Sequence, residues 1–179
     1  NRHRRSAARS RAAHQRRNPA ATQALTLRAA CARVVRLGVV NPLTSLGYPL
    51  AERTLSNGMR VIVSRDHGAP VVAVNLWYNV GSRDEATGET GLAHLFEHVM
   101  FQGSENVASG EHLAALQAAG GSVNATTSFD RTNYFEAVPS GALDLALWLE
   151  ADRLATLPQA LTTENLDNQR DVVKEEKRQ

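Results

Sequence analysis

The sequence is 179 residues long, enough for one domain with a hydrophobic core but too short for two ordinary domains. Its net charge of +2 hides an asymmetry. The first 40 residues hold ten arginines and no acidic residue, whereas residues 41–179 hold ten basic and eighteen acidic residues, a net charge of −8. A surface of that charge repels phosphate, so we expect no nucleic-acid binding by the folded part.

The arginine-rich start, residues 1–47, is predicted to be a disordered tail outside the folded domain. Its composition of arginine, alanine and serine also matches an organellar transit peptide, which would give a mitochondrial location in a eukaryote. The single cysteine, Cys31, excludes an internal disulfide framework and favours a reducing compartment, so the cytoplasm is the expected location.

No membrane span is predicted. The best apolar run is interrupted by Arg28, Arg33 and Arg36 and falls short of the ~20 residues that a span needs. We also expect the sequence to be a fragment, because it starts without methionine and stops inside the charged run KEEKRQ.

Residues 48–179 are predicted to form an α+β domain, a two-layer sandwich in which helices cover a mainly antiparallel sheet. LSNGMRVIVSRD, residues 55–66, predicts a hairpin with a type I′ turn at Asn57-Gly58. The apolar run VVAVNLWYNV, residues 71–80, predicts a central, well-covered strand.

The remaining elements are predicted helices and one pair of strands, each bounded by a capping or breaking residue. In chain order they are a helix from Gly91 to Gln102 between Thr90 and Gly103, a helix after Ser109 that ends at Gly120-Gly121, the strands SVNATTSF and TNYFEAVP, a helix from Ser140 to Pro158, and a last helix from Thr162 or Thr163. Strands in pairs and helices in pairs favour α+β over alternating βα units.

The helix GLAHLFEHVMF carries two histidines four residues apart. A helical wheel places four apolar residues on one face, a predicted core-facing stripe: Leu92, Leu95, Phe96 and Val99. His94, Glu97 and His98 share the opposite face. Two such histidines can each present a nitrogen to one zinc ion, and a glutamate beside them can reach a metal-bound water.

The alternative is a solvent-facing helix with ordinary polar residues. A His-x-x-Glu-His pattern would arise by chance in roughly one such sequence in a hundred. The other four histidines belong to no such pattern of histidine and glutamate. We predict that all of them are surface residues: His3, His14, His67 and His112.

A catalytic zinc ion needs a third protein ligand and one open position. On the last helix, Val172 and Val173 are predicted to face inward with Glu176 between them, whereas Glu175 points away. An acid on an inward face is costly unless it is paired, and a metal ion would pair with Glu176. A helix end that frays into solvent is the alternative.

The sequence around these residues resembles the insulinase, pitrilysin and mitochondrial-processing-peptidase family of metallopeptidases, which carry the inverted zinc motif His-x-x-Glu-His. The resemblance covers about residues 48–179 in several blocks: LSNGMRVIV, NVGSRDE, TGLAHLFEHVMFQGS, AGGSVNATTSFDRTNY, LDLALWLEADRL and NQRDVVKEEKRQ. It implies that His94 and His98 are zinc ligands and that Glu97 is the general base.

The family's third ligand is a glutamate in an R-x-x-V-x-x-E pattern, which Arg170, Val173 and Glu176 match. The match therefore selects the same glutamate as the helical wheel. One position departs from the family: Gln169 stands where a second glutamate is common. Because glutamine hydrogen-bonds but adds no charge, we expect Gln169 to tune activity rather than abolish it.

The resemblance implies a zinc-dependent endopeptidase that hydrolyses peptides or unfolded segments with metal-activated water. It implies that the peptide substrate lies as an added strand along Asn124 and Ala125, although an ordinary interior strand is the alternative there. It also implies a second homologous half, in the same chain or in a partner subunit, so the fragment alone is expected to be poorly active. Two other classes stay open: a non-catalytic family subunit that serves as a scaffold or assembly partner, and a binder of nucleic acid or membrane through the basic tail.

Overall fold

The computed structural model describes residues 49–178, so the predictions for residues 1–47 lie outside the described part of the chain. A two-stranded antiparallel hairpin comes first, followed by a three-stranded antiparallel sheet in the order β3-β5-β4. The strands are β1 (Leu50–Thr54), β2 (Arg60–Ser64), β3 (Val71–Tyr78), β4 (Ser122–Thr127) and β5 (Thr132–Pro139).

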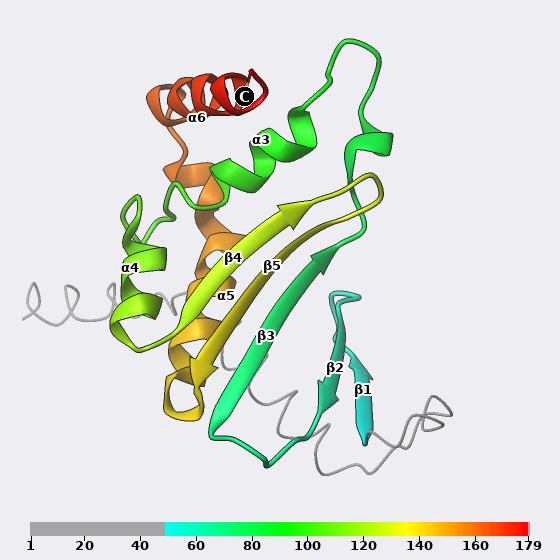
Figure 1. The fold of residues 1–179 in the computed structure, drawn as a ribbon, viewed down its shortest axis with the longest axis vertical. Helices are drawn as coiled ribbons and strands as arrows, with labels where there is room; N and C mark the ends of the chain where they lie inside the picture. The colour runs from blue at the N-terminus through cyan, green and yellow to red at the C-terminus, as the bar shows by residue number, and fades with distance from the viewer. Residues whose placement is uncertain (1–48, 179) are drawn as a thin grey trace, which may run out of the picture.

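Four helices complete the described part of the chain: α3 (Leu92–Val99), α4 (Glu111–Ala118), α5 (Leu143–Ala160) and α6 (Thr163–Glu176). Two single 3₁₀ turns lie before α3 and α5: η2 (Ser82–Asp84) and η3 (Ser140–Ala142). Figure 1 shows α4 and α5 packed against the sheet, α3 alongside β4, and α6 on the other side of α3. The predicted two-layer α+β fold is confirmed.

The core lies between the sheet and the pair α4 and α5. It contains Val107, Leu116, Val138, Ala146 and Leu149, all at most 5% exposed. A fully buried leucine stabilises the fold by about 1.5–3 kcal/mol relative to an exposed one. The sheet is therefore held rigidly by its covered face, and it supports α3 through the contact between β4 and α3.

The first hairpin is confirmed, but its turn is not type I′. That turn needs a positive φ at two successive residues, and in the described chain only glycines have positive φ, here Gly58 at +87°. The Gly58 N–H donates to the Leu55 carbonyl at 3.0 Å, and the Asn57 side chain accepts the Met59 N–H at 3.1 Å. One left-handed glycine closes the loop, and Asn57 acts through its side chain.

The prediction that β3 is a covered central strand is wrong. β5 is the central strand, and β3 forms the edge of its three-stranded sheet. Alternate β3 side chains are exposed, with Val71 at 53% and Trp77 at 61%. A continuous apolar run therefore does not distinguish a strand covered on both faces from one with a bare apolar face.

The predicted start of α6 is confirmed, but other helix boundaries differ: α3 ends at Val99 rather than Gln102, and α5 begins at Leu143, after the 3₁₀ turn that opens at Ser140. Thr162 caps α6, since its Oγ1 accepts the Asn165 N–H at 3.1 Å. Pro158 does not end α5, which runs on to Ala160; a proline so near the helix end costs one backbone hydrogen bond but not the remaining turn. Thr90 and Ser109 do not cap α3 and α4, whose N-cap residues are glycines. Within residues 49–178, no helix has the length and apolar character needed to cross a membrane.

Candidate metal centre

The histidine helix α3 buries fewer of its apolar side chains than the predicted core-facing stripe contains. Ala93 and Val99 are buried, but Leu92 is 38% and Phe96 is 53% exposed. The predicted core-facing stripe is therefore wrong for those two residues. The reason is position: α3 contacts β4 and α6 at the margin of the described domain rather than lying over the middle of the sheet.

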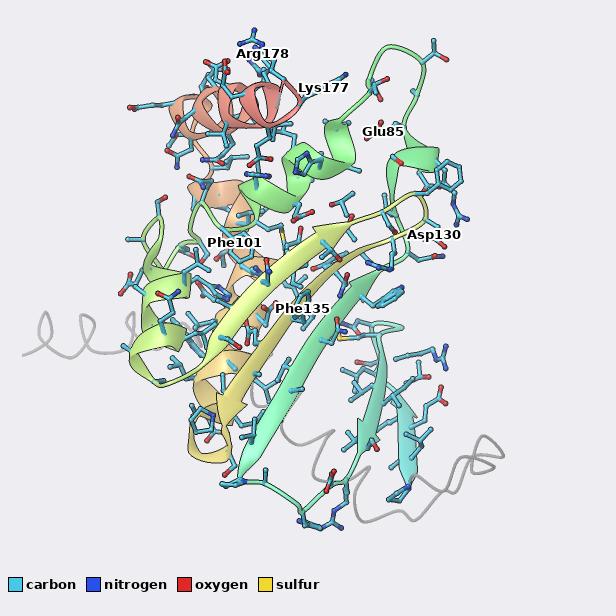
Figure 2. The ribbon with its side chains drawn as sticks, viewed as in Figure 1. Glu85, Phe101, Asp130, Phe135, Lys177 and Arg178 are labelled. Carbon is cyan, nitrogen blue, oxygen red and sulfur yellow. The ribbon has the colours of Figure 1, made fainter. Side chains whose placement is uncertain are left out.

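The start of α3 is fixed by the side chain of Glu85, which no pattern in the sequence marked as a site residue. Both carboxylate oxygens of Glu85 accept backbone N–H groups of the first turn, from Gly91 and Ala93, each at 2.9 Å. These hydrogen bonds lower the pKa of Glu85. Figure 2 shows Glu85 next to the first turn of α3. It belongs to the block NVGSRDE, and an isolated acid seven residues before a helix carries no local capping signal.

Three donor atoms converge between α3 and α6. The Nε2 atoms of His94 and His98 lie 3.1 Å apart, and the Oε2 atom of Glu176 lies 3.3 Å from the first and 3.4 Å from the second. We name His94, His98 and Glu176 the candidate zinc site. Helical spacing places the two histidines together, and the packing of α6 on α3 adds the glutamate.

The spacing of these atoms fits a tetrahedral zinc ion. With zinc–ligand bonds of about 2.0–2.1 Å, neighbouring ligands in a tetrahedron are about 3.3–3.4 Å apart. Two imidazole nitrogens and one carboxylate oxygen are also the donor types that zinc takes in catalytic sites. One neutral histidine can donate its Nε2 proton to the other ring, but the accepting nitrogen then has no proton to offer Glu176, whereas one shared cation satisfies every pair.

The candidate zinc site is open to solvent on one side. The side chains of His94, His98 and Glu176 are 40%, 21% and 45% exposed. A pocket reaches His94 and Glu176 and is also lined by Glu85 and Val173. The prediction that Glu176 lies on a buried helix face is therefore only partly correct, because this side chain is 45% exposed. The pocket beside it leaves an accessible position for a reacting molecule.

Glu97 lies beside the three donors but not among them. Its Oε2 accepts a short hydrogen bond from Thr127 Oγ1 at the end of β4. Glu97 and His94 also line a second pocket together with Thr127. The threonine hydroxyl fixes the carboxylate towards the end of β4, and no local pattern in the sequence identified Thr127 as part of the site.

The predicted faces of α6 are partly correct. Val173 lines the pocket beside Glu176, and Glu175 is exposed and pairs with Arg178. Val172 is 37% exposed, so the prediction that it faces inward is wrong. Gln169 is half-buried one turn before Val173, on the same side of the helix.

A second polar cluster lies in the core. His112 Nε2 is 3.0 Å from Glu136 Oε1 and 3.8 Å from Glu150 Oε1, and Arg153 donates to both oxygens of Glu150 at 2.9 and 2.5 Å. His112 is 3% exposed, so the prediction of a surface histidine is wrong there; His67 is exposed as predicted, and His3 and His14 lie outside the described residues.

Burial governs the charges of this core cluster. It lowers the pKa of His112 to about 4 and raises that of Glu150 to about 7, and it also raises the pKa of Glu136. Burial therefore favours a neutral His112 and opposes full ionisation of both carboxyl groups beside the single positive charge of Arg153. The Arg153 guanidinium supplies the cation of this cluster, so the core cluster does not need a metal ion.

Comparison with known proteins shows how widely this architecture is shared. The sequence profile of the insulinase family, peptidase family M16, matches residues 60–179. The "Zinc protease PqqE" of Helicobacter pylori is 38% identical over 126 residues, which are 70% of this chain and 28% of that protein. A probable mitochondrial-processing peptidase subunit beta of Arabidopsis thaliana is 31% identical over 120 residues, 67% of this chain and 22% of that protein.

Solved structures agree with the sequence comparison. The crystal structure of a protease from Helicobacter pylori superposes on this chain with a TM-score of 0.68 and 36% sequence identity. The superposed part is 72% of this chain and 30% of the protease chain. The crystal structure of pitrilysin superposes with a TM-score of 0.65 and 30% sequence identity. The superposed part is 72% of this chain and 14% of the pitrilysin chain. This chain thus spans less than a third of the length of these relatives.

The fold and the candidate zinc site define a class of α+β domain in which one helix carries both histidines and a second helix brings an acid to them. More particularly, the chain belongs to the insulinase family, peptidase family M16. The resemblance found in the sequence is confirmed at the level of the family.

Proposed function

We propose that this chain is the zinc-binding part of a metalloendopeptidase that hydrolyses peptides or unfolded segments. The observation that carries the proposal is the convergence of His94 Nε2, His98 Nε2 and Glu176 Oε2 within 3.1–3.4 Å beside Glu97. A zinc ion held by these donors supplies a Lewis acid and lowers the pKa of water to about 7. The names of the relatives support the same chemistry.

Glu97 has the position of the general base. Its carboxylate borders the pocket beside His94, where it accepts a proton from water as the water oxygen attacks the scissile carbonyl carbon. The same carboxyl group then passes that proton to the leaving amine nitrogen. Thr127 holds the carboxylate during both transfers by donating to one of its oxygens, which leaves the other oxygen for the proton.

The edge of β4 has the backbone pattern needed to hold a peptide. The Ser128 N–H donates to the Arg131 carbonyl at 2.8 Å, so Ser128 and Arg131 form a hydrogen-bonded pair. Hydrogen-bonded and non-hydrogen-bonded pairs alternate along antiparallel strands, so the N–H and C=O groups of Ala125, opposite Tyr134, point away from β5. Among the described residues β4 has no strand on that side, and the Ala125 N–H is bonded only to the Asn124 side chain, at 2.8 Å. A substrate strand would take the place of Asn124 Oδ1 on the Ala125 N–H, and the released Asn124 amide would hydrogen-bond the peptide in turn, which is the role proposed for Asn124 and Ala125.

A second homologous half is part of the proposal, because the described residues leave the candidate zinc site open on one side. Whether that half is covalent or a separate subunit, it would close the site around an extended peptide. Experiments on activity therefore use the intact protein with both halves present.

The metal content tests the proposed site. We expect the intact protein to hold about one zinc ion per chain and His94→Ala to lose most of it, because two ligands bind zinc far more weakly than three. Elemental analysis by mass spectrometry after gel filtration measures the ratio. His67→Ala, which removes an exposed histidine remote from the site, should keep the full content. Equal zinc in the two variants would contradict the assignment, and the absence of zinc in the parent would favour a non-catalytic family subunit.

The proposed substrate strand predicts a binding defect. Asn124→Ala should raise KM for a test peptide about three- to tenfold with little change in kcat, because one side-chain hydrogen bond contributes about 0.5–1.5 kcal/mol. Steady-state kinetics with a quenched fluorescent peptide measure both constants. Ser122→Ala, at the exposed start of the same strand, is the matched control. If both variants bind the peptide like the parent, the peptide does not use this position of β4.

A further inference from the structure

The turn between β4 and β5 presents an aromatic side chain to solvent next to the proposed peptidase site. Phe129 is 70% exposed, the highest value among the large exposed hydrophobic side chains of residues 49–178. An exposed phenylalanine contributes little to the stability of the described domain, so its burial against another molecule is favourable. Figure 2 places the neighbouring Asp130 at this turn, on the same side of the molecule as Glu85.

The backbone under Phe129 is held firmly. Its carbonyl accepts the Arg83 N–H at 2.9 Å, and the carbonyl of Ser128 accepts the Ser82 N–H at 3.1 Å. Gly81 allows this contact, because a Cβ atom there would lie 2.4 Å from the Ser128 oxygen and 2.6 Å from the Phe129 oxygen. The turn is thus clamped to the segment before α3, and Phe129 is an aromatic group on a fixed backbone rather than on a free loop.

Phe129 shares a pocket with the residues of the proposed chemistry. Of the described residues that line this pocket, Phe129 alone has a large apolar side chain; the others are His94, Glu97 and hydroxyl-bearing residues. Thr126 and Thr127 form the pocket wall on β4, so a peptide lying along that edge would place one side chain against the phenyl ring. The Arg131 guanidinium touches this wall, but it donates to Thr126 and Asn133 and stacks on Trp77 at 4.9 Å, so its hydrogen bonds are already used within the domain.

We propose that Phe129 is a specificity-determining residue that selects a large apolar side chain at one of the two substrate positions flanking the scissile bond. The inference rests on the proposed peptidase function and adds the substrate class to it. An aromatic side chain on a fixed backbone beside neutral hydroxyl groups binds aliphatic or aromatic side chains and gains nothing from small or acidic ones. Because Phe129 shares this pocket with Glu97 and His94, the selected side chain would lie close to the reacting carbonyl rather than several residues away.

The test uses the zinc-loaded intact protein and a set of quenched peptides that differ only at the two positions flanking the cleaved bond, with phenylalanine, leucine, alanine or aspartate at each. Mass spectrometry confirms the cleaved bond. The parent should prefer phenylalanine or leucine over alanine at one position by about tenfold or more in kcat/KM. Phe129→Ala should reduce this ratio to less than about threefold and leave kcat/KM for the alanine peptide within about twofold of the parent.

Phe96→Ala is the matched control, since Phe96 is also a half-exposed phenylalanine but lies outside both pockets. It should keep the preference of the parent. An unchanged ratio in Phe129→Ala would overturn the inference and leave the proposed function intact. An equal loss on all peptides with a lower midpoint of thermal unfolding would also overturn it, because Phe129 would then support the fold. If the zinc-loaded parent cleaves no peptide of the set or of a mixed peptide library, the proposed function fails, and the inference fails with it.

Discussion

Glu97→Gln should lower kcat of the zinc-loaded intact protein by about 10²–10⁴-fold, because glutamine has nearly the same size and shape as glutamate but lacks the carboxylate that acts as general base. Glutamine still offers an oxygen to the Thr127 hydroxyl but cannot take a proton from water. The zinc content should stay at about one ion per chain, since Glu97 is not one of the three converging donors. Steady-state kinetics on a quenched peptide and elemental analysis on the same preparation measure the two quantities.

The matched control for this variant is Glu175→Gln on α6. Glu175 is next to Glu176 in sequence, but it is exposed and pairs with Arg178 on the far side of the helix. Its replacement should leave both kcat and zinc content unchanged. A Glu97→Gln variant that cleaves peptides as fast as the parent would exclude the proposed role of Glu97. A variant that lost zinc would instead place Glu97 among the ligands.

Local helical spacing accounts for the part of the site that was predictable. His94 and His98 must share a face because residues four apart in a helix lie one above the other. The start of α6 was predictable for a similar reason, since Thr162 offers its hydroxyl oxygen to the next turn. Glu176 follows 78 residues after His98 in the sequence. Its helix face could be predicted, but only the packing of α6 on α3 brings it to the histidines.

Residues whose role depends on partners distant in the sequence could not be predicted. His112 is buried because Glu136 on β5 and Glu150 on α5 face it, and nothing within α4 distinguishes it from an exposed histidine. Phe96 shows the opposite case: it belongs to an apolar stripe but is exposed, because α3 lies at the margin of the described domain. Thr127 and Glu85 act on α3 from a strand end and a loop, where hydroxyl and acidic side chains are common for other reasons.

The core cluster of His112, Glu136, Glu150 and Arg153 connects the stability of the fold to the helix that carries the candidate zinc site. The Arg153 guanidinium lies 4.4 Å above the Tyr134 ring and 5.4 Å above the Phe101 ring, which follows α3 directly. Phe101 in turn contacts Tyr134 edge to face at 5.8 Å. The end of α3 therefore rests on aromatic rings that contact a buried charge, so Phe101 links the histidine helix to the core cluster.

Arg153→Met should lower the free energy of unfolding of the intact protein by about 3–5 kcal/mol, the usual cost of removing one partner of a buried ion pair. Arg153 is 2% and Glu150 0% exposed, so the variant leaves two buried carboxyl groups without a cation. Urea unfolding monitored by circular dichroism measures the change. Arg170→Met is the matched control: it breaks an exposed pair of the same i, i+3 spacing, with Asp167 at 2.6 Å, and should cost less than about 1 kcal/mol.

A double variant separates the loss of the cation from the loss of packing. Glu150→Leu combined with Arg153→Met removes both charges of the pair, so it should be more stable than Arg153→Met alone, since an unpaired buried acid costs more than an apolar replacement. If Arg153→Met costs no more than Arg170→Met, the guanidinium does not hold the core cluster together. If the double variant is no more stable than Arg153→Met, the cost arises from lost contact with the rings of Tyr134 and Phe101 instead of from the unpaired acids.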